Sequence, residues 1–139
     1  MEQDQDNIIV YTDGACSKNP GPAGIGAVLI WKDHIKEISE YIGKATNNIA
    51  ELKAILKALT SIKNKNLPVR LYTDSTYAIG VLSGWKIHAN KTLIKEIKKE
   101  MKRFSSLSIR KVEGHSGQPE NERADKLAKD AIKGHLNIL

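Results

Sequence analysis

The chain has 139 residues, of which 40% are hydrophobic, so it can bury a core within one domain and is not a disordered chain. No apolar stretch reaches the roughly 20 residues of a membrane helix, and the acidic first seven residues exclude a typical secretory signal, so we expect no membrane partner. Cys16 is the only cysteine, which excludes a disulfide framework and favours a reducing, cytoplasmic setting, while the net charge of +6 is compatible with a polyanionic partner.

The first half of the chain predicts three strands and a helix. Residues 8–13 form an apolar strand that stops at a glycine, and residues 24–31 and 35–43 follow as two strands joined by a short hairpin. Apolar residues at helical spacing then predict a helix over residues 48–63. Residues 1–7, with three acids and no base, are expected to form a flexible acidic tail.

The second half alternates strands with helices. It predicts a strand over 69–74, helices over 75–83 and 90–104, and a strand over 107–112. The last helix begins at Pro119 and its expected C-cap is Gly134, so the domain covers residues 8–134 and residues 135–139 form a short C-terminal tail. Three antiparallel strands followed by crossover units indicate an α/β fold in which helices pack on a mixed sheet.

Two of the predicted strands end alike, in Tyr-Thr-Asp, at Asp13 and at Asp74. In open α/β sheets, binding sites form beyond the carboxyl ends of the strands, so parallel neighbouring strands would bring these two carboxylates together. Neighbouring carboxylates are unfavourable unless a cation neutralises them or one of them keeps its proton. Either aspartate alone is explained by a turn or a helix cap, but the matched pair favours a site for Mg²⁺ or Mn²⁺.

Three further residues have ordinary explanations when each is taken alone. Glu51 follows Asn48 at the spacing of a capping box, which would make it the N3 residue of its helix. Asp125 lies four residues before Lys129, as in an exposed helical ion pair. His115 lies between glycines, where its near-neutral pKa suits proton transfer, although an exposed loop histidine is the usual case.

Four sequence blocks, taken together, resemble the signature blocks of type 1 ribonuclease H. They are Tyr11-Thr-Asp-Gly-Ala-Cys-Ser-Lys-Asn-Pro-Gly-Pro22, Thr46-Asn-Asn-Ile-Ala-Glu-Leu52, Thr73-Asp-Ser-Thr-Tyr77 and Gly114-His-Ser-Gly-Gln-Pro-Glu-Asn-Glu-Arg-Ala-Asp125. The resemblance covers about residues 8–133. Any one block alone would be weak evidence, but four blocks in order with fitting spacing are highly specific.

The resemblance implies a fold, a reaction and a set of active-site residues. The fold is a five-stranded mixed sheet flanked by helices, and the reaction is hydrolysis of the RNA strand of an RNA–DNA hybrid, which leaves 5′-phosphate and 3′-hydroxyl ends. Asp13, Glu51, Asp74 and Asp125 match the four acids that hold two Mg²⁺ ions when substrate is bound, with Mn²⁺ as a substitute. His115 matches a mobile histidine thought to assist proton transfer or product release.

The resemblance also implies residues that contact the hybrid. The residues that match contacts near the cut are Cys16, Asn19, Asn47 and Asn48. Those that match a pocket for a phosphate of the DNA strand are Lys44, Thr46 and Asn90, and those that match an aromatic pair packed against DNA sugars are Tyr77 and Trp85. Turn, capping and core roles are the alternatives for these residues.

The chain departs from better-known bacterial members of the family, which insert a basic helix and loop, the basic protrusion, after the tryptophan. Here only residues 86–89 separate Trp85 from Asn90, so the protrusion is absent. Residues 86–103 carry seven bases and two acids, and they form either a nucleic-acid-binding face or an ordinary solvated helix face. The rival functions for this expected monomer are a nuclease of the same fold that acts on other nucleic acids and a non-catalytic hybrid-binding module.

Overall fold

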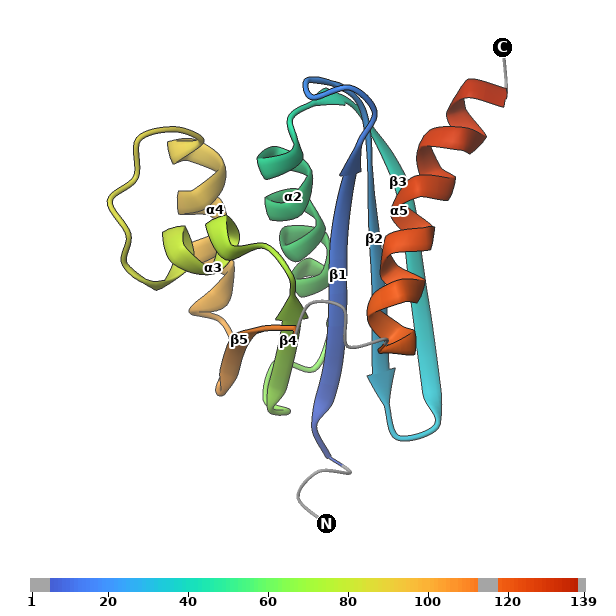
Figure 1. Ribbon diagram of the computed structural model, residues 1–139. Coiled ribbons are helices and arrows are strands. Elements are labelled where there is room, and N and C mark those ends of the chain that lie inside the picture. Colours follow the sequence, from blue (N-terminus) through green and yellow to red (C-terminus); the bar gives the residue numbers. More distant parts are fainter. Residues whose placement is uncertain (1–5, 113–117, 138–139) are drawn as a thin grey trace.

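The computed structural model describes residues 6–112 and 118–137, with the side chain of residue 137 left out, and its centre is a five-stranded sheet (Figure 1). The strands are β1 (Ile8–Cys16), β2 (Gly21–Trp31), β3 (His34–Ala45), β4 (Val69–Thr73) and β5 (Leu107–Lys111). They lie in the order β3-β2-β1-β4-β5. The first three strands pair antiparallel, and β1, β4 and β5 pair parallel, which confirms the predicted mixed sheet.

Helices cover both faces of the sheet, so the molecule has three layers (Figure 1). The helices are α2 (Asn47–Thr60), α3 (Thr76–Ser83), α4 (Lys91–Met101) and α5 (Pro119–Asn137). Helix α5 packs on β1, β2 and β3 from one side, whereas α2 packs on β1 and β2 from the other and carries α3 and α4 against it. This is the arrangement expected when crossover helices bury both faces of a sheet.

The alternation of side chains along the strands builds a separate core on each face. Val10 belongs to the larger core, where it meets the buried faces of α2 and α4 at residues such as Leu52 and Ile94. Its neighbour Tyr11 points the other way, into the smaller core under Leu127 of α5. Strand β1 is therefore buried on both sides, and a polar residue near its end is held between two helical layers.

Helix α5 packs closely on the sheet because β2 has glycine at the two positions that face this helix, Gly24 and Gly26. A Cβ atom built on Gly24 would lie 2.3 Å from the carbonyl oxygen of Ala128, and one built on Gly26 would lie 2.1 Å from that of Ala124. Both distances are far below any normal contact, so only glycine fits at these positions. Since Gly26 pairs with Asp13 across β1 and β2, this packing brings the first half of α5 close to Asp13.

Several element boundaries differ from those expected from the sequence. Helix α5 continues through Gly134 to Asn137, so the expectation that this glycine is the C-cap was wrong. Helix α2 ends at Thr60, three residues early, where the Ser61 hydroxyl donates to the carbonyl of Lys57. Asn7 is buried directly ahead of β1. Among the described residues, no helix is both long and apolar enough to span a bilayer.

Candidate metal centre

The two aspartates at the predicted strand ends lie on neighbouring parallel strands. Strands β1 and β4 pair in parallel register, with Tyr11 opposite Tyr72, and the two tyrosine rings stack with their centroids 5.1 Å apart. Asp13 and Asp74 each follow two residues later, on the same side of the pleat. Strand β4 ends at Thr73, whereas β1 continues to Cys16 because β2 still pairs with it. Asp13 therefore still lies within a paired strand, whereas Asp74 lies just past the end of its own strand.

Glu51 comes to this site from the first half of α2. The N-cap of α2 is Thr46, whose hydroxyl accepts a hydrogen bond from the N–H of Ile49 at 3.1 Å, so Glu51 is not the N3 residue and the capping-box alternative was wrong. Its Oε1 instead accepts a 2.6 Å hydrogen bond from the backbone N–H of Gly14 on β1. A residue 37 positions earlier in the chain thus fixes the Glu51 carboxylate.

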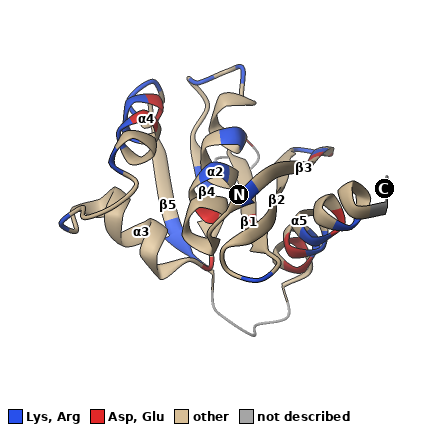
Figure 2. Cartoon of the chain, turned by 90° about the horizontal axis from the view of Figure 1, so that it is seen from above, with Lys and Arg blue, Asp and Glu red and all other residues tan. Residues whose placement is uncertain are grey.

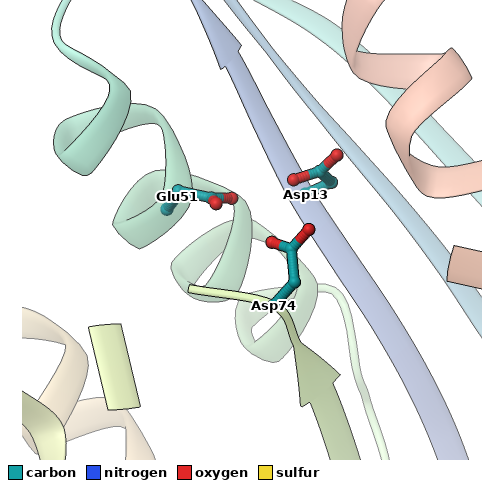
Figure 3. A group of neighbouring side chains, drawn as sticks. All are labelled: Asp13, Glu51 and Asp74. Atoms are coloured by element: carbon teal, nitrogen blue, oxygen red, sulfur yellow. The ribbon is translucent and has the colours of Figure 1, made fainter. Parts of the chain in front are cut away.

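The carboxylates of Asp13, Glu51 and Asp74 point toward one another from β1, α2 and the end of β4 (Figure 3). One oxygen of each carboxylate lies within 4.8 Å of the others. Asp13 is buried, Glu51 is partly buried and Asp74 is exposed, so the cluster opens to solvent on the side of Asp74. Three carboxylates at this separation supply the oxygen ligands that Mg²⁺, Mn²⁺ and Ca²⁺ prefer.

Asp125 lies beside this cluster rather than within it. Its carboxyl group is close enough to hydrogen-bond Asp13, which helps to raise the pKa of Asp13. Oδ2 of Asp125 also forms a 2.9 Å ion pair with Lys129, one helical turn later on α5. The spacing of the two residues in the sequence predicted this ion pair. The two explanations are compatible, because one carboxylate can meet the aspartate on one side and the lysine on the other.

Electrostatics show that the cluster is unfavourable without a cation. Burial, followed by the charge of Glu51, raises the pKa of Asp13 far above its usual range. Burial and the charge of Asp74 raise the pKa of Glu51 to about 7, although the N–H of Gly14 acts in the opposite direction. A bound divalent cation would remove this penalty by neutralising the carboxylates.

Comparison with known proteins agrees with this geometry. A family model described as RNase H matches residues 5–133, which is nearly the whole chain. The chain belongs to the ribonuclease H family. Ribonuclease H of Syntrophomonas wolfei is 42% identical over 140 residues, covering 91% of this chain and 96% of that protein. Ribonuclease H of Brucella anthropi is 43% identical over 139 residues, covering 91% and 90%.

Solved ribonuclease H structures share the fold as well as the sequence. Ribonuclease H1 of the archaeon Halobacterium salinarum superposes with a TM-score of 0.81 at 31% identity, covering 92% of this chain and 98% of that one. LC11 ribonuclease H1, isolated from compost, superposes in its complex with an RNA/DNA hybrid with a TM-score of 0.74 at 32% identity, covering 93% and 99%. The resemblance to type 1 ribonuclease H is confirmed.

The ribonuclease H motif residues near the β1–β2 turn gather at the start of α2. The Asn19 side-chain oxygen accepts from the N–H of Asn47 at 3.1 Å, and the Cys16 thiol donates to the Ala45 carbonyl at a sulfur–oxygen distance of 3.1 Å. These contacts tie the turn to the junction of β3 and α2. Of the expected hybrid contacts in this region, Asn19, Lys44, Asn47 and Asn48 are exposed, while Thr46 is half-buried as the N-cap.

The expected aromatic pair lies on α3 and just after it. Tyr77 is half-buried against the larger core, and its hydroxyl accepts a 3.0 Å hydrogen bond from the Asn90 side chain. Trp85 is 55% exposed, and its ring lies on Gly80, where an added Cβ atom would come within 2.2 Å of the indole. Residues 84–90 join α3 to α4 without a helix, so the basic protrusion is absent as expected. His115 lies outside the described residues.

Two supporting features of the site were missed by the sequence reasoning. Gly14, next to Asp13, provides the N–H that holds Glu51, and its position in the first motif block was the available signal. Lys111, at the end of β5, donates a 2.8 Å hydrogen bond to the hydroxyl of Thr76, two residues after Asp74. A lysine that ends a strand in a basic chain carries no distinctive signal of its own, so only the fold reveals this contact.

Proposed function

We propose that this protein is an endonuclease that hydrolyses the RNA strand of RNA–DNA hybrids, leaving 5′-phosphate and 3′-hydroxyl ends. The observation that carries the proposal is the carboxylate cluster of Asp13, Glu51 and Asp74 in a chain of the ribonuclease H family. The hybrid as substrate is supported by the related LC11 ribonuclease H1, which was solved in complex with an RNA/DNA hybrid.

The donor set fits divalent cations. All the ligand atoms are carboxylate oxygens, and burial together with the neighbouring carboxylates raises the pKa values of Asp13 and Glu51, a penalty that a bound cation would relieve. We assign metal binding to Asp13, Glu51, Asp74 and Asp125, with Mg²⁺ as the physiological ion and Mn²⁺ as a substitute. Two ions are expected when substrate is bound, because substrate phosphate oxygens complete the coordination of Mg²⁺.

The protein supplies position and charge to this chemistry. When bound, divalent ions at such a site activate water as a nucleophile and stabilise the charge that develops on the leaving oxygen. Asp13 is the one proposed ligand that is buried, whereas Glu51 and Asp125 are partly buried and Asp74 is exposed. Gly14 orients Glu51 through its backbone N–H. Lys129 orients Asp125, and its positive charge offsets part of the negative charge of the cluster. On the resemblance alone, we assign proton transfer or product release to His115.

Substrate choice is assigned to the residues around the cluster. RNA differs from DNA in its 2′-hydroxyl groups, which are read in the shallow minor groove of an A-like duplex. The proposed contacts near the cut are Cys16, Asn19, Asn47 and Asn48. The proposed contacts to the DNA strand are Lys44, Thr46, Tyr77, Trp85 and Asn90. We further propose that the protein acts as a monomer in the cytoplasm.

A digestion experiment tests the reaction. A hybrid, a duplex RNA and a duplex DNA of the same sequence are incubated with the protein and Mg²⁺, and each strand carries its own label. We expect only the RNA strand of the hybrid to be shortened, with phosphate at the 5′ ends of the products. Cleavage of the DNA, or equal cleavage of the duplex RNA, would contradict the proposal and favour a different nuclease of the same fold.

The Asp13→Asn variant separates catalysis from binding. Loss of one carboxylate should abolish cleavage with Mg²⁺, while hybrid binding measured by fluorescence anisotropy survives. If the unmodified protein binds the hybrid but does not cut it with Mg²⁺ or Mn²⁺, the non-catalytic binding module is the better explanation.

A further inference from the structure

Helix α4 carries a row of lysines that the metal centre does not use. A groove of about 460 Å³ runs along the helix, with the apolar side chains of Ile87 and Ile94 in it. Its remaining lining residues are all lysines, namely Lys91, Lys95, Lys98, Lys99 and Lys102. Four of these lysines are exposed and Lys98 is half-buried. Figure 2 shows the lysine positions in blue along α4, together with its acidic positions in red.

The acids of α4 are turned away from this lysine groove. Glu100 is engaged with Lys65, at 3.6 Å, and with Arg103, at 3.3 Å. Glu96 lies in a different groove, between α4, α2 and β3. Within residues 6–112 and 118–137, no ion pair involves any of the five lysines. The positive charge of the lysine groove is therefore not neutralised by the part of the protein that the structure describes.

Helix stability does not explain this arrangement. The helix dipole favours acidic residues in the first turn, but α4 has none there and begins with Lys91. Lys91, Lys95 and Lys99 follow one another at intervals of four, and like charges at this spacing destabilise a helix. Lys98 and Lys99, in the last turn, and the C-cap residue Lys102 complement the dipole, but Lys91 and Lys95 do not. A face that weakens its own helix indicates a partner with strong negative charge.

The dimensions of the row fit a nucleic-acid backbone. Residues 91–102 of a helix span about 16 Å at 1.5 Å per residue. One strand of a duplex presents a phosphate about every 3.4 Å along its axis but also winds around that axis, so a straight row of this length can reach a few phosphates of one strand. Lysine side chains are long enough to adjust to the exact phosphate positions, and their charges bind without regard to base sequence.

The lysine groove is also connected to the metal centre through α3. Helix α3 begins at its N-cap Ser75, directly after Asp74, and the segment after α3 carries the exposed Trp85 and then Ile87, which lies in the groove. The hydrogen bond from Asn90 to Tyr77 fixes the start of α4 against α3. A hybrid that contacts Trp85 would therefore lie within a few residues of the groove, which Ile87 and Lys91 line.

We propose that the lysine groove of α4 binds backbone phosphates of the hybrid at a distance from the cut, and that it provides the anchoring that the missing basic protrusion would otherwise give. This inference rests on the proposed function, since it concerns the same substrate. It assigns substrate binding to Lys91, Lys95, Lys98, Lys99 and Lys102.

The test compares two triple variants that remove the same charge. Lys91→Gln/Lys95→Gln/Lys99→Gln changes the lysine groove, and all three residues are exposed. Lys36→Gln/Lys63→Gln/Lys133→Gln changes exposed lysines on β3, after α2 and on α5. Hybrid binding is measured by anisotropy in EDTA, so that no strand is cut, over a series of salt concentrations. Removal of three like charges at helical spacing should leave α4 at least as stable, and circular dichroism checks this.

The expected result is a smaller salt dependence for the groove variant. The slope of log Kd against log salt should fall by roughly 2 to 3, since each lost phosphate contact removes about 0.9. The control variant should keep the slope of the unmodified protein. In Mg²⁺, the groove variant should show a KM raised by about tenfold or more, with kcat at saturating hybrid retained.

An unchanged slope in the groove variant would overturn the inference, and an acidic protein partner would then be the better explanation of the lysine groove. An equal decrease of the slope in the control variant would also overturn it, because the effect would then come from net charge alone. Hybrid binding that does not depend on salt would overturn it as well. Failure of the proposed function would be seen differently. The unmodified protein would then leave the RNA strand of the hybrid intact in Mg²⁺, whatever the salt dependence of hybrid binding in the variants.

Discussion

The backbone N–H of Gly14 donates a 2.6 Å hydrogen bond to the Glu51 carboxylate, so strand β1 positions a carboxylate of the candidate metal centre that helix α2 carries. The same glycine allows the helix to come this close. A Cβ atom built on Gly14 would lie 2.4 Å from the carbonyl carbon of Ala50 and 2.5 Å from the backbone nitrogen of Glu51. Both neighbours are backbone atoms, so a side chain at position 14 must push α2 away from β1.

Gly14→Ala should therefore impair catalysis more than it impairs folding. We expect a loss of roughly 1–3 kcal/mol in the free energy of unfolding, as for other overpacked sites. A shift of Glu51 by about 1 Å would lower kcat by about a hundredfold. Gly134→Ala is the matched control, because Gly134 lies within α5 and its added Cβ would meet nothing within 4 Å apart from its chain neighbours and the nearby backbone of its own helix. That change should stabilise the helix slightly and leave kcat unchanged. Equal activity of the two variants would contradict the role of Gly14.

Without metal, the stability of the protein should fall as the pH rises through the neutral range. The pKa of Glu51 is raised from 4.5 to about 7, and the pKa of Asp13 is raised as well, so the folded protein holds protons that the unfolded chain releases. The free energy of unfolding should therefore decline as the pH rises above about 4.5. Glu51 alone accounts for on the order of 3 kcal/mol by about pH 7, and Asp13, whose pKa is raised to about 10, extends the decline to higher pH. Thermal unfolding in EDTA at a series of pH values measures this decline.

Two comparisons test whether this decline in stability comes from the carboxylate cluster. Asp13→Asn removes one of the buried acids, so the variant should be more stable than the unmodified protein at pH 8 in EDTA, and its decline should be shallower. Mg²⁺ binds the deprotonated carboxylates, so its stabilising effect on the unmodified protein should grow from pH 6 to pH 8. A metal-free protein that becomes more stable over this range would refute the raised pKa values.

The sequence predicted the part of the site that depends on strand ends. Asp13 and Asp74 were expected to meet because Tyr-Thr-Asp ends two strands, and parallel pairing of β1 with β4 confirmed this. The continuation of β1 to Cys16 was not predicted, because it depends on the pairing with β2 rather than on local sequence. The mixed sheet with helices packed on it follows from general rules for α/β folds and was predicted, whereas the strand order β3-β2-β1-β4-β5 was not.

The roles of Glu51 and Asp125 could not be derived from local patterns. Thr46 and Asn48 are both good N-cap residues, and the structure chose Thr46, which left Glu51 free to meet Gly14. The ion pair of Asp125 with Lys129 was read correctly from the spacing, but the approach of Asp125 to Asp13 depends on the close packing of α5 over β2. Contacts between segments far apart in the chain decided both roles.

Variants of Thr46 distinguish helix capping from phosphate binding. The Thr46 hydroxyl caps α2 by accepting from the N–H of Ile49. Thr46→Ala should lose about 1 kcal/mol of stability, whereas Thr46→Asp keeps a good N-cap and should lose little. If the residue also lies beside a substrate phosphate, the added negative charge should raise the KM for the hybrid in Thr46→Asp at unchanged stability. Chemical denaturation and steady-state kinetics of both variants separate the two roles, and a KM unaffected by the aspartate would limit Thr46 to capping.

Gly80→Ala should test the proposed contact of Trp85 with the hybrid without altering the tryptophan itself. The added Cβ atom would lie 2.2 Å from the indole ring, so the ring must leave its place on α3. Because Trp85 is 55% exposed, the ring can swing into solvent, and alanine favours a helix over glycine by up to about 1 kcal/mol, so stability should change little. The KM for the hybrid should rise toward that of Trp85→Ala, with kcat retained. Tryptophan fluorescence in a Trp31→Phe background reports the displacement directly. A displaced ring with an unchanged KM would remove Trp85 from the substrate-binding surface.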